Sequence, residues 1–318
     1  MAWRLPTSCS RCATTSRSIE TALPTLDTPA LLAQTADLDL IIRHVLAGLG
    51  HGMHAGRERG AGVEFSEYRA YAPGDEWRRV DWKLMARADR YYVREAERDS
   101  HVAIWLWLDA TASMAEPSRS IEGLTKLQYA RAILACVAGI AQRQGDAFGL
   151  VVCSGGRMQF TPASRGPRQM HRVLAQLSKA EAAGSLPDTD ALRASLHFAR
   201  APSLIFAVSD FLDWPSAQSE ALLRLRRMRH DVRALCLQTR AERDASFPLD
   251  QAWRDPEQEE GTYRLAADTL AHYRKARDEH FARVMGQCRQ NDLPALTACI
   301  EDALPGVLRG WLRLAGRA

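Results

Sequence analysis

The chain has 318 residues, of which 46% are apolar and 25% charged, a composition typical of a soluble globular protein with a packed core. Its formal net charge of +4 is too small to indicate a nucleic-acid or membrane-surface partner, and no uninterrupted apolar stretch approaches the roughly 18 residues of a membrane-spanning helix. Seven scattered cysteines indicate reduced thiols in a cytoplasmic protein rather than a disulfide framework.

Residues 1–36 differ in composition from the rest of the chain. Their first part, "MAWRLPTSCSRCATTSRS", contains three arginines, many hydroxyl residues and no acid, and it lacks the apolar segment of a secretory signal. We predict a flexible N-terminal tail, with a transit peptide or a misassigned start codon as alternative interpretations. Cys9 and Cys12 form a lone C-x-x-C, which predicts neither a zinc nor a redox site because no second pair of ligands is near.

Residues 37–100 are predicted to form an N-terminal β-rich segment. It opens with an amphipathic helix at 38–48, which has its apolar side chains on one face. The glycine-rich stretch "GLGHGMHAGRERGAG" follows and is typical of a loop. We interpret His51 and His54 within it as solvated, because no third metal ligand accompanies them.

Alternating aromatic and β-branched residues predict two strands in this segment, at 63–71 and 91–97, separated by the turn signal "PGD". The stretch 64–97 is also rich in arginine, aspartate and tryptophan. Guanidinium groups pair with carboxylates and stack on aromatic rings. We therefore interpret the block as a structural ion-pair network, with a binding surface as the alternative.

From residue 101 to residue 240 short apolar runs alternate with helical patterns, which is typical of an α/β fold with a doubly wound, mostly parallel sheet. The predicted strands are "VAIWLWL", "AFGLVVCS" with its hairpin return "GGRMQFTP", "PSLIFAVSD" and "DVRALCLQT". The predicted helices are "LTKLQYARAILACVAGIAQRQG", "PRQMHRVLAQLSKAE", "ALRASLHFA" and "AQSEALLRLRRMRH". We interpret the arginines of "LRLRRMRHDVR" as a solvated helix face rather than a phosphate-binding patch.

Residues 241–318 are predicted to form a C-terminal strand and helical extension. A charged loop is followed by a strand at "GTYRLAA" and a long helix at about 268–291. The final stretch, "LPALTACIEDALPGVLRGWLRL", has apolar periodicity that two prolines interrupt.

Small oxygen-bearing side chains follow two of the predicted parallel strands. Asp109, Thr111 and Ser113 come directly after the first strand, in "DATAS", and Asp210 follows the third. Ligands of open α/β sheets bind at the carboxyl ends of the strands, and two neighbouring carboxylates repel unless a cation lies between them. Carboxylates with hydroxyls suit a hard ion, so we expect Mg²⁺, with Mn²⁺ or Ca²⁺ as alternatives. Thr189, in a later loop, offers a further hydroxyl.

This pattern resembles the metal-ion-dependent adhesion site of von Willebrand factor A domains. Asp109, Thr111 and Ser113 match its first motif, D-x-T/S-x-S, with Thr111 where the commoner form has serine. Thr189 corresponds to the loop threonine, although Ser185 in the same loop is an alternative, and Asp210 corresponds to the last aspartate. The resemblance implies the von Willebrand factor A-like fold and an open coordination position that a partner's carboxylate fills.

The block "EFSEYRAYAPGDEWRRVDWKLMARADRYYVRE" resembles the signature of the bacterial family called domain of unknown function 58. The resemblance spans roughly residues 40–310. Many relatives have two membrane helices before this block, whereas this chain resembles a shorter branch without them. The family is usually found beside MoxR-type AAA+ ATPases, which implies a partner of that kind, or its client.

We therefore expect a metal-dependent protein–protein interaction module, an adaptor that works with a MoxR-type AAA+ ATPase in protein maturation or assembly. A metal-dependent hydrolase or phosphotransferase is the first alternative. It is disfavoured because "DATAS" lacks the second aspartate of D-x-D phosphatases and the chain has no phosphate-binding loop motif, so we expect no enzymatic activity. A metal-free structural scaffold, in which these residues only cap helices and turns, is the second alternative.

Overall fold

The computed structural model describes residues 28–50, 65–70, 85, 87, 91–96, 102–199, 201–248, 252–254, 262–264 and 266–314. The interpretations of Cys9, Cys12, His51 and His54, and most of the block 64–97, lie outside these residues. Within the described ranges, no helix combines the length and the apolar character needed to cross a lipid bilayer.

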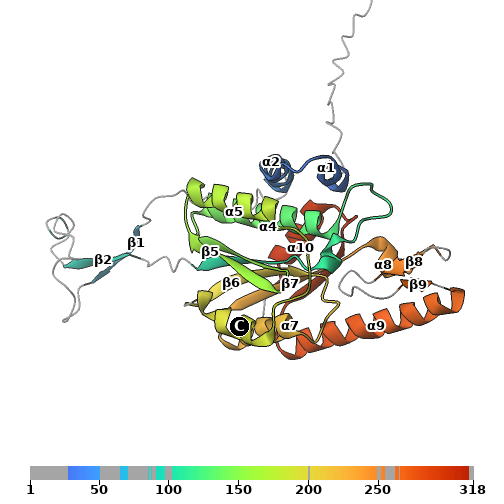
Figure 1. Ribbon diagram of the computed structural model, residues 1–318. Helices are drawn as coiled ribbons and strands as arrows, with labels where there is room; N and C mark the ends of the chain where they lie inside the picture. The colour runs from blue at the N-terminus through green and yellow to red at the C-terminus, as the bar shows by residue number, and fades with distance from the viewer. Residues whose placement is uncertain are drawn as a thin grey trace, which may run out of the picture.

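A six-stranded sheet forms the centre of the molecule, with the strand order β5-β4-β3-β6-β7-β10 (Figure 1). All neighbouring strands are parallel except β4 and β5, which pair as an antiparallel hairpin at one edge. These strands are β3 (Ala103–Asp109), β4 (Phe148–Ser154), β5 (Arg157–Ser164), β6 (Ser203–Ser209), β7 (Asp231–Gln238) and β10 (Ala295–Cys299). The predicted doubly wound, mostly parallel α/β sheet is thus confirmed.

Two small antiparallel sheets are separate from the central one. The first pairs β1 (Phe65–Ala70) with β2 (Tyr92–Ala96), and the second pairs β8 (Ala252–Arg254) with β9 (Thr262–Arg264). β1 and β2 correspond to the two strands predicted at 63–71 and 91–97, and β9 to the strand predicted at "GTYRLAA".

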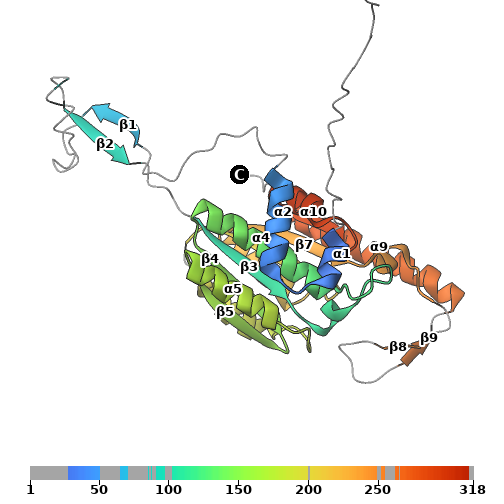
Figure 2. The same cartoon turned by 90° about the horizontal axis from the view of Figure 1, so that it is seen from above.

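Helices cover both faces of the central sheet (Figures 1 and 2). One apolar layer is shared by α1 (Thr28–Gln34), α2 (Leu38–Gly50), α4 (Lys126–Gln144), α5 (Pro167–Lys179) and α10 (Leu304–Leu312). The opposite layer contains α6 (Thr189–Ser195), the short 3-10 helix η3 (Leu196–Phe198), α7 (Ala217–Arg227) and α9 (Ala267–Gln290). The turn η2 (Ala112–Ala115) follows β3, and α8 (Arg240–Asp244) follows β7.

Local sequence explains where the main helix begins and ends. α4 starts after Thr125, whose hydroxyl accepts from Gln128 N while the Gln128 side chain accepts from Thr125 N, a capping box. It ends at Gly145, which has a left-handed φ of 76° that glycine adopts without strain. The predicted helix "LTKLQYARAILACVAGIAQRQG" ends at the same glycine.

The structure differs from the expected segment boundaries at both ends of the chain. Residues 28–34 belong to the predicted tail but form α1, in which Leu32 is buried in the layer with α4. β10 and α10 belong to the predicted extension, yet β10 pairs with β7 as the sixth strand of the central sheet. Both segments pack against the central domain because their apolar side chains cover apolar surface of the sheet and of α4 that would otherwise face water.

Close packing of β4 against its neighbours β3 and β5 leaves no room for a side chain at Gly149. A Cβ at Gly149 lies 2.6 Å from Cζ3 of the buried Trp105 and 2.8 Å from the Thr161 carbonyl oxygen. Gly149→Ala is therefore expected to lower the free energy of unfolding by roughly 1–3 kcal/mol, measured by urea denaturation. Gly286→Ala, on α9 where nothing lies within 4 Å, is the control and is expected to stabilise slightly. Equal stability of both variants contradicts the packing argument.

Candidate metal centre

The two predicted carboxylates lie side by side at the carboxyl end of the sheet. β3 and β6 are parallel neighbours in which Leu108 pairs with Val208. Asp109 is the last residue of β3, and Asp210 directly follows β6. Both are almost fully buried, with 2% and 3% of their surface exposed. The strand register thus brings together two acids that are about 100 residues apart in the chain.

The carboxylate of Asp109 is held by hydrogen bonds on both oxygens. Thr111 N donates to Oδ1 at 3.0 Å, and the Ser209 hydroxyl donates to Oδ2 at 2.6 Å. When the Gln218 amide nitrogen faces the carboxylate, it donates to Oδ2 at 3.1 Å, and the amide oxygen accepts from Trp107 Nε1 at 3.2 Å. The carboxylate is therefore fixed in position from three elements.

These hydrogen bonds do not compensate for the burial of Asp109. Burial, and secondly the charge of Asp210, raise the pKa of Asp109 from 3.8 to about 7, although Ser209 and Thr111 lower it. Without a cation, ionised Asp109 is consequently unfavourable at neutral pH. A positive charge beside the two aspartates relieves this repulsion.

The hydroxyls of the first motif lie next to this pair. Thr111 is 2% exposed, and its Oγ1 is 3.2 Å from the Ser113 Oγ. The turn is anchored to the loop before α6, because Ala112 N donates to the Gly184 carbonyl at 2.9 Å. The structure thus brings Asp109, Thr111, Ser113 and Asp210 together, as predicted.

Thr189 lies near this cluster but is not shown to contact it. It is the first residue of α6, half-buried, and it lines a groove together with Ala217 of α7. Asp188 caps α6 by accepting from Ala191 N at 2.7 Å. The alternative residue, Ser185, is exposed and accepts a hydrogen bond from Gly156 N through its carbonyl oxygen. The choice between Thr189 and Ser185 stays a prediction.

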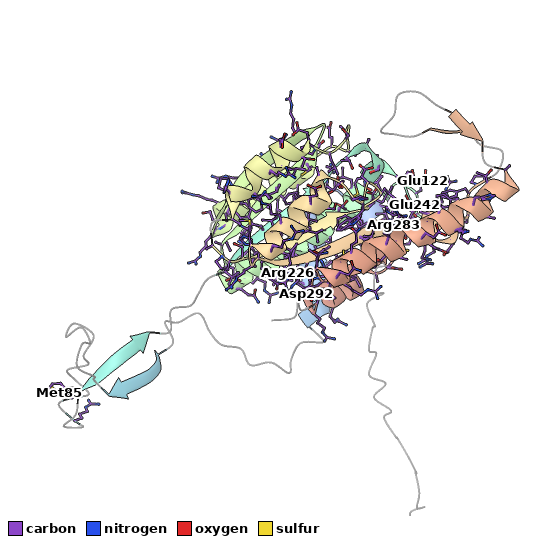
Figure 3. All side chains as sticks on the ribbon, turned by 90° about the horizontal axis from the view of Figure 1, so that it is seen from below. Met85, Glu122, Arg226, Glu242, Arg283 and Asp292 are labelled. Atoms are coloured by element: carbon purple, nitrogen blue, oxygen red, sulfur yellow. The ribbon has the colours of Figure 1, made fainter. Side chains whose placement is uncertain are left out.

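Lys126 is a charged residue of the site that the sequence analysis did not identify. Its side chain is 1% exposed, and its ammonium group donates to Asp210 Oδ2 at 2.8 Å and to Glu242 Oε1 at 3.0 Å. Burial lowers the pKa of Lys126, but the two carboxylates outweigh burial, so the net pKa is raised and the group stays charged. Glu242, on α8, lies at the carboxyl end of the sheet, and Asp292 lies at the other end (Figure 3).

The residues present fit a hard divalent ion. Asp109 and Asp210 supply carboxylate oxygens and Thr111 and Ser113 supply hydroxyls, the donor types that Mg²⁺ prefers. Among the residues that the structure describes, Asp210 Oδ1 accepts a hydrogen bond from Leu212 N alone, at 3.3 Å, so it keeps a free lone pair. In the described part of the chain no three His, Cys, Asp or Glu residues are grouped as metal ligands, so the site depends on its hydroxyls.

Negative charge remains in excess after Lys126 is counted. Its one ammonium faces two carboxylates, Asp210 and Glu242, while Asp109 adds a third. Burial, and secondly the charge of Glu242, also raise the pKa of Glu116, although the charges of Lys126 and Arg119 lower it. An additional cation at this end of the sheet is therefore electrostatically favourable.

Comparison with known proteins identifies the family. The model of the family described as "Protein of unknown function DUF58" matches residues 67–284. The chain belongs to the DUF58 family. This DUF58 protein is 32% identical over 232 residues to the uncharacterized protein Rv1480 of Mycobacterium tuberculosis, covering 70% of this chain and 69% of the relative. The same values hold for the uncharacterized protein Mb1516 of Mycobacterium bovis.

Solved structures with a similar course of the chain include BatB from Bacteroides thetaiotaomicron and the VWA domain of SpRpn10. BatB is 12% identical, with a TM-score of 0.39 and coverage of 67% of this chain and 99% of BatB. The SpRpn10 domain is 9% identical, with a TM-score of 0.39 and coverage of 68% and 98%. A likeness at this level concerns the fold and carries no information on ligands.

Proposed function

We propose that this DUF58 protein is a protein-interaction module whose site binds a divalent cation and, through it, a carboxylate of the partner. The carrying observation is the pair of adjacent buried carboxylates, Asp109 and Asp210, with the Thr111 and Ser113 hydroxyls beside them. Asp109, Thr111, Ser113, Asp210 and either Thr189 or Ser185 would hold Mg²⁺. The ion would supply the positive charge that attracts the partner's acid.

The surface beside the site supports binding of a protein. Leu212, two residues after Asp210, has 46% of its surface exposed. A large apolar side chain that is exposed next to a charged site offers a contact which excludes water around the polar one. We therefore place Leu212 in the proposed interface.

Binding is proposed rather than catalysis. Thr111 stands where D-x-D phosphatases have a second aspartate, and a threonine hydroxyl is a poor general acid. The partner we propose is a MoxR-type AAA+ ATPase or its client, because the resemblance in the block 64–97 implies such a neighbour. The proposed location is the cytoplasm.

A metal-free scaffold is the second candidate, and one specific observation favours it. The Lys126 ammonium already lies 2.8 Å from Asp210 and supplies part of the positive charge that a metal ion brings. In this alternative the aspartates and hydroxyls only fix the loops at the end of the sheet.

Affinity capture with the full chain as bait separates these candidates. With 2 mM Mg²⁺ the bait is expected to retain a MoxR-type ATPase, and EDTA or Asp109→Ala is expected to reduce recovery at least about tenfold, a loss near 1.4 kcal/mol. Asp39→Ala, an exposed site on α2, is the matched control. Calorimetric titration with Mg²⁺ and Mn²⁺ measures ion binding directly. Equal recovery from all four samples supports the scaffold.

A further inference from the structure

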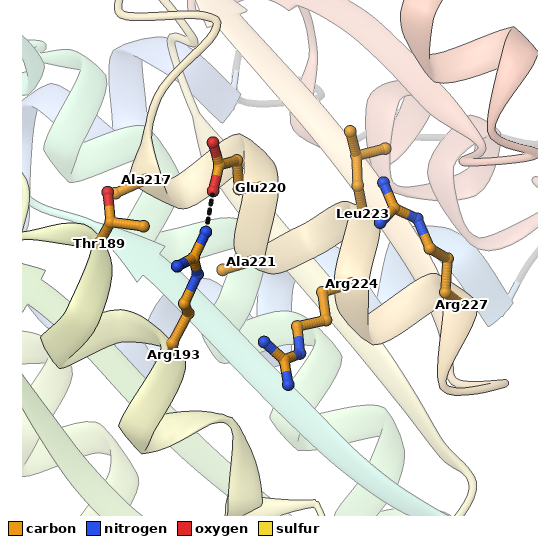
Figure 4. Close-up of a pocket in the computed structure, with 8 residues that line it drawn as sticks. All are labelled: Thr189, Arg193, Ala217, Glu220, Ala221, Leu223, Arg224 and Arg227. Carbon is orange, nitrogen blue, oxygen red and sulfur yellow. Dashed lines mark hydrogen bonds and ion pairs between the residues drawn. The ribbon is translucent and has the colours of Figure 1, made fainter.

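A groove runs between α6 and α7 (Figure 4) and begins at Thr189 and Ala217, the first residues of the two helices. Its cavity volume is about 360 Å³, and Thr189 and Ala217 form the end nearest the site. Gln218, next to Ala217 in the chain, is the residue whose amide faces Asp109. The first turn of α7 therefore places this end of the groove at the same edge of the sheet as the rim at which the partner's carboxylate is proposed to bind.

The rest of the groove is lined mainly by arginines. Arg193 extends from α6 across the groove to Glu220 of α7, with its Nη2 3.2 Å from Oε2 (Figure 4). Arg224 and Arg227 follow on α7. They are three residues apart, so they share one helix face. The groove thus carries three guanidinium groups and one carboxylate.

Arg224 and Arg227 are exposed, and within the described residues neither has an ion-pair partner. Two unpaired guanidinium groups on one face repel each other and attract anions. Guanidinium groups also pair with carboxylates through two parallel hydrogen bonds. The sequence analysis interpreted these arginines as a solvated helix face. In the structure both line the same groove, so their charges act on one site.

We infer that this groove binds an extended acidic segment of the partner, whose further carboxylates pair with Arg224 and Arg227. The inference rests on the proposed function for the first carboxylate, at the rim. Along α7 the rise of about 1.5 Å per residue places Arg224 roughly 10 Å and Arg227 roughly 15 Å from Ala217. An extended peptide advances about 3.3 Å per residue. Counted from the residue that lies beside Ala217, where we place the rim carboxylate, the matching acids therefore follow after about three and about five residues.

Fluorescence anisotropy with two labelled peptides tests this spacing on the full chain in Mg²⁺ and about 50 mM salt. The acidic probe is Gly-Asp-Ala-Ala-Glu-Ala-Glu-Gly, and the reference probe has glutamine in place of both glutamates. Retro-sequence peptides cover the opposite chain direction. In one of the two directions the acidic probe is expected to bind about tenfold tighter than its reference, since two exposed ion pairs each contribute up to about 1 kcal/mol.

Arg224→Gln combined with Arg227→Gln is expected to reduce this ratio to about one, while both probes still bind. Arg165→Gln with Arg168→Gln changes two exposed arginines on the other face of the sheet, one just before α5 and one in its first turn. This variant removes the same charge and is expected to keep the tenfold ratio. A ratio of one in the wild type, or an unchanged ratio in the α7 variant, overturns the inference.

A different readout tests the proposed function in the same experiment. EDTA or Asp109→Ala is expected to weaken both probes by the same factor, because the rim contact is common to them. If the affinities are unchanged in EDTA, the proposed metal site at the rim is contradicted. The ratio of the two affinities still tests the groove, because it depends only on the two glutamates. An oligothymidylate of equal charge that binds as tightly as the acidic probe overturns the assignment to a peptide.

Discussion

Asp109→Asn is expected to stabilise the protein in EDTA at pH 8 and to have little effect near pH 4. Burial and the neighbouring Asp210 raise the pKa of Asp109 to about 7 from 3.8. A group whose pKa is raised on folding stabilises the folded state at low pH and loses that contribution as the pH rises through 3.8 to 7. At 1.36 kcal/mol per pH unit the whole contribution is on the order of 4 kcal/mol.

Asparagine keeps only the hydrogen bond on one side of the group: its carbonyl oxygen accepts from Thr111 N as Asp109 Oδ1 does. Its amide nitrogen cannot accept from the Ser209 hydroxyl or the Gln218 amide as Asp109 Oδ2 does, so those two groups must turn. This cost does not depend on pH, so the test is the change of the stability difference with pH rather than its absolute size. The free energy of unfolding is measured by urea denaturation from pH 5 to pH 8, where the advantage of the variant grows by roughly 3 kcal/mol. Asp39→Asn, exposed on α2, is expected to show no such growth. A constant difference means that ionised Asp109 is stabilised in the fold by another group.

Mg²⁺ adds a second readout to the same variant. If the ion binds beside Asp109, it replaces the missing positive charge and raises the unfolding temperature of the wild type at pH 8. Asp109→Asn removes one full negative charge from the site, so the same addition has a smaller effect. The variant that is more stable in EDTA is thus expected to be the less responsive to the ion.

The acids of the site could be predicted from the sequence because the apolar runs of the strands end immediately before them. Asp109 and Asp210 follow continuous apolar runs, and parallel strands place their carboxyl ends along one edge. Thr111 and Ser113 could be predicted as well, because they lie two and four residues after Asp109 in the turn that follows β3. Thr189 illustrates the limit, because its position depends on a loop whose course no periodicity specifies.

Lys126 was not found because nothing in its surroundings marks it as buried. It follows Thr125 at the first position of a helix, where a lysine is usually solvated, and its partners Asp210 and Glu242 are 84 and 116 residues away. β10 escaped prediction for a similar reason. Its five residues lie between Pro294 and Pro305, and their strand character arises from pairing with β7.

Lys126→Met is expected to lower the stability of the protein strongly. Methionine has a similar length and no charge, so Asp210 and Glu242 become a buried pair of like charges without a cation. Removing one partner of a buried ion pair costs roughly 3–5 kcal/mol. For a domain of this size that lowers the unfolding temperature by ~10 °C, measured by calorimetry in EDTA at pH 8.

The matched control is Lys275→Met. The Lys275 side chain is 77% exposed, and it lies 4.0 Å from Glu279 on the same helix, so its replacement is expected to change stability by less than about 0.5 kcal/mol. Lys126→Met with Glu242→Gln removes one of the uncompensated charges and is expected to recover part of the loss. If the double variant is as unstable as the single one, the Lys126 effect is due to packing rather than charge.

The same substitution decides between a cation site and a metal-free scaffold. Without the ammonium, Asp210 Oδ2 is free to bind an ion and the site is more negative by one charge. Lys126→Met is therefore expected to bind Mg²⁺ more tightly than the wild type and to regain stability when the ion is added. If Mg²⁺ restores nothing, even to this more acidic site, the ammonium of Lys126 is the cation that the fold uses. The two aspartates are then structural.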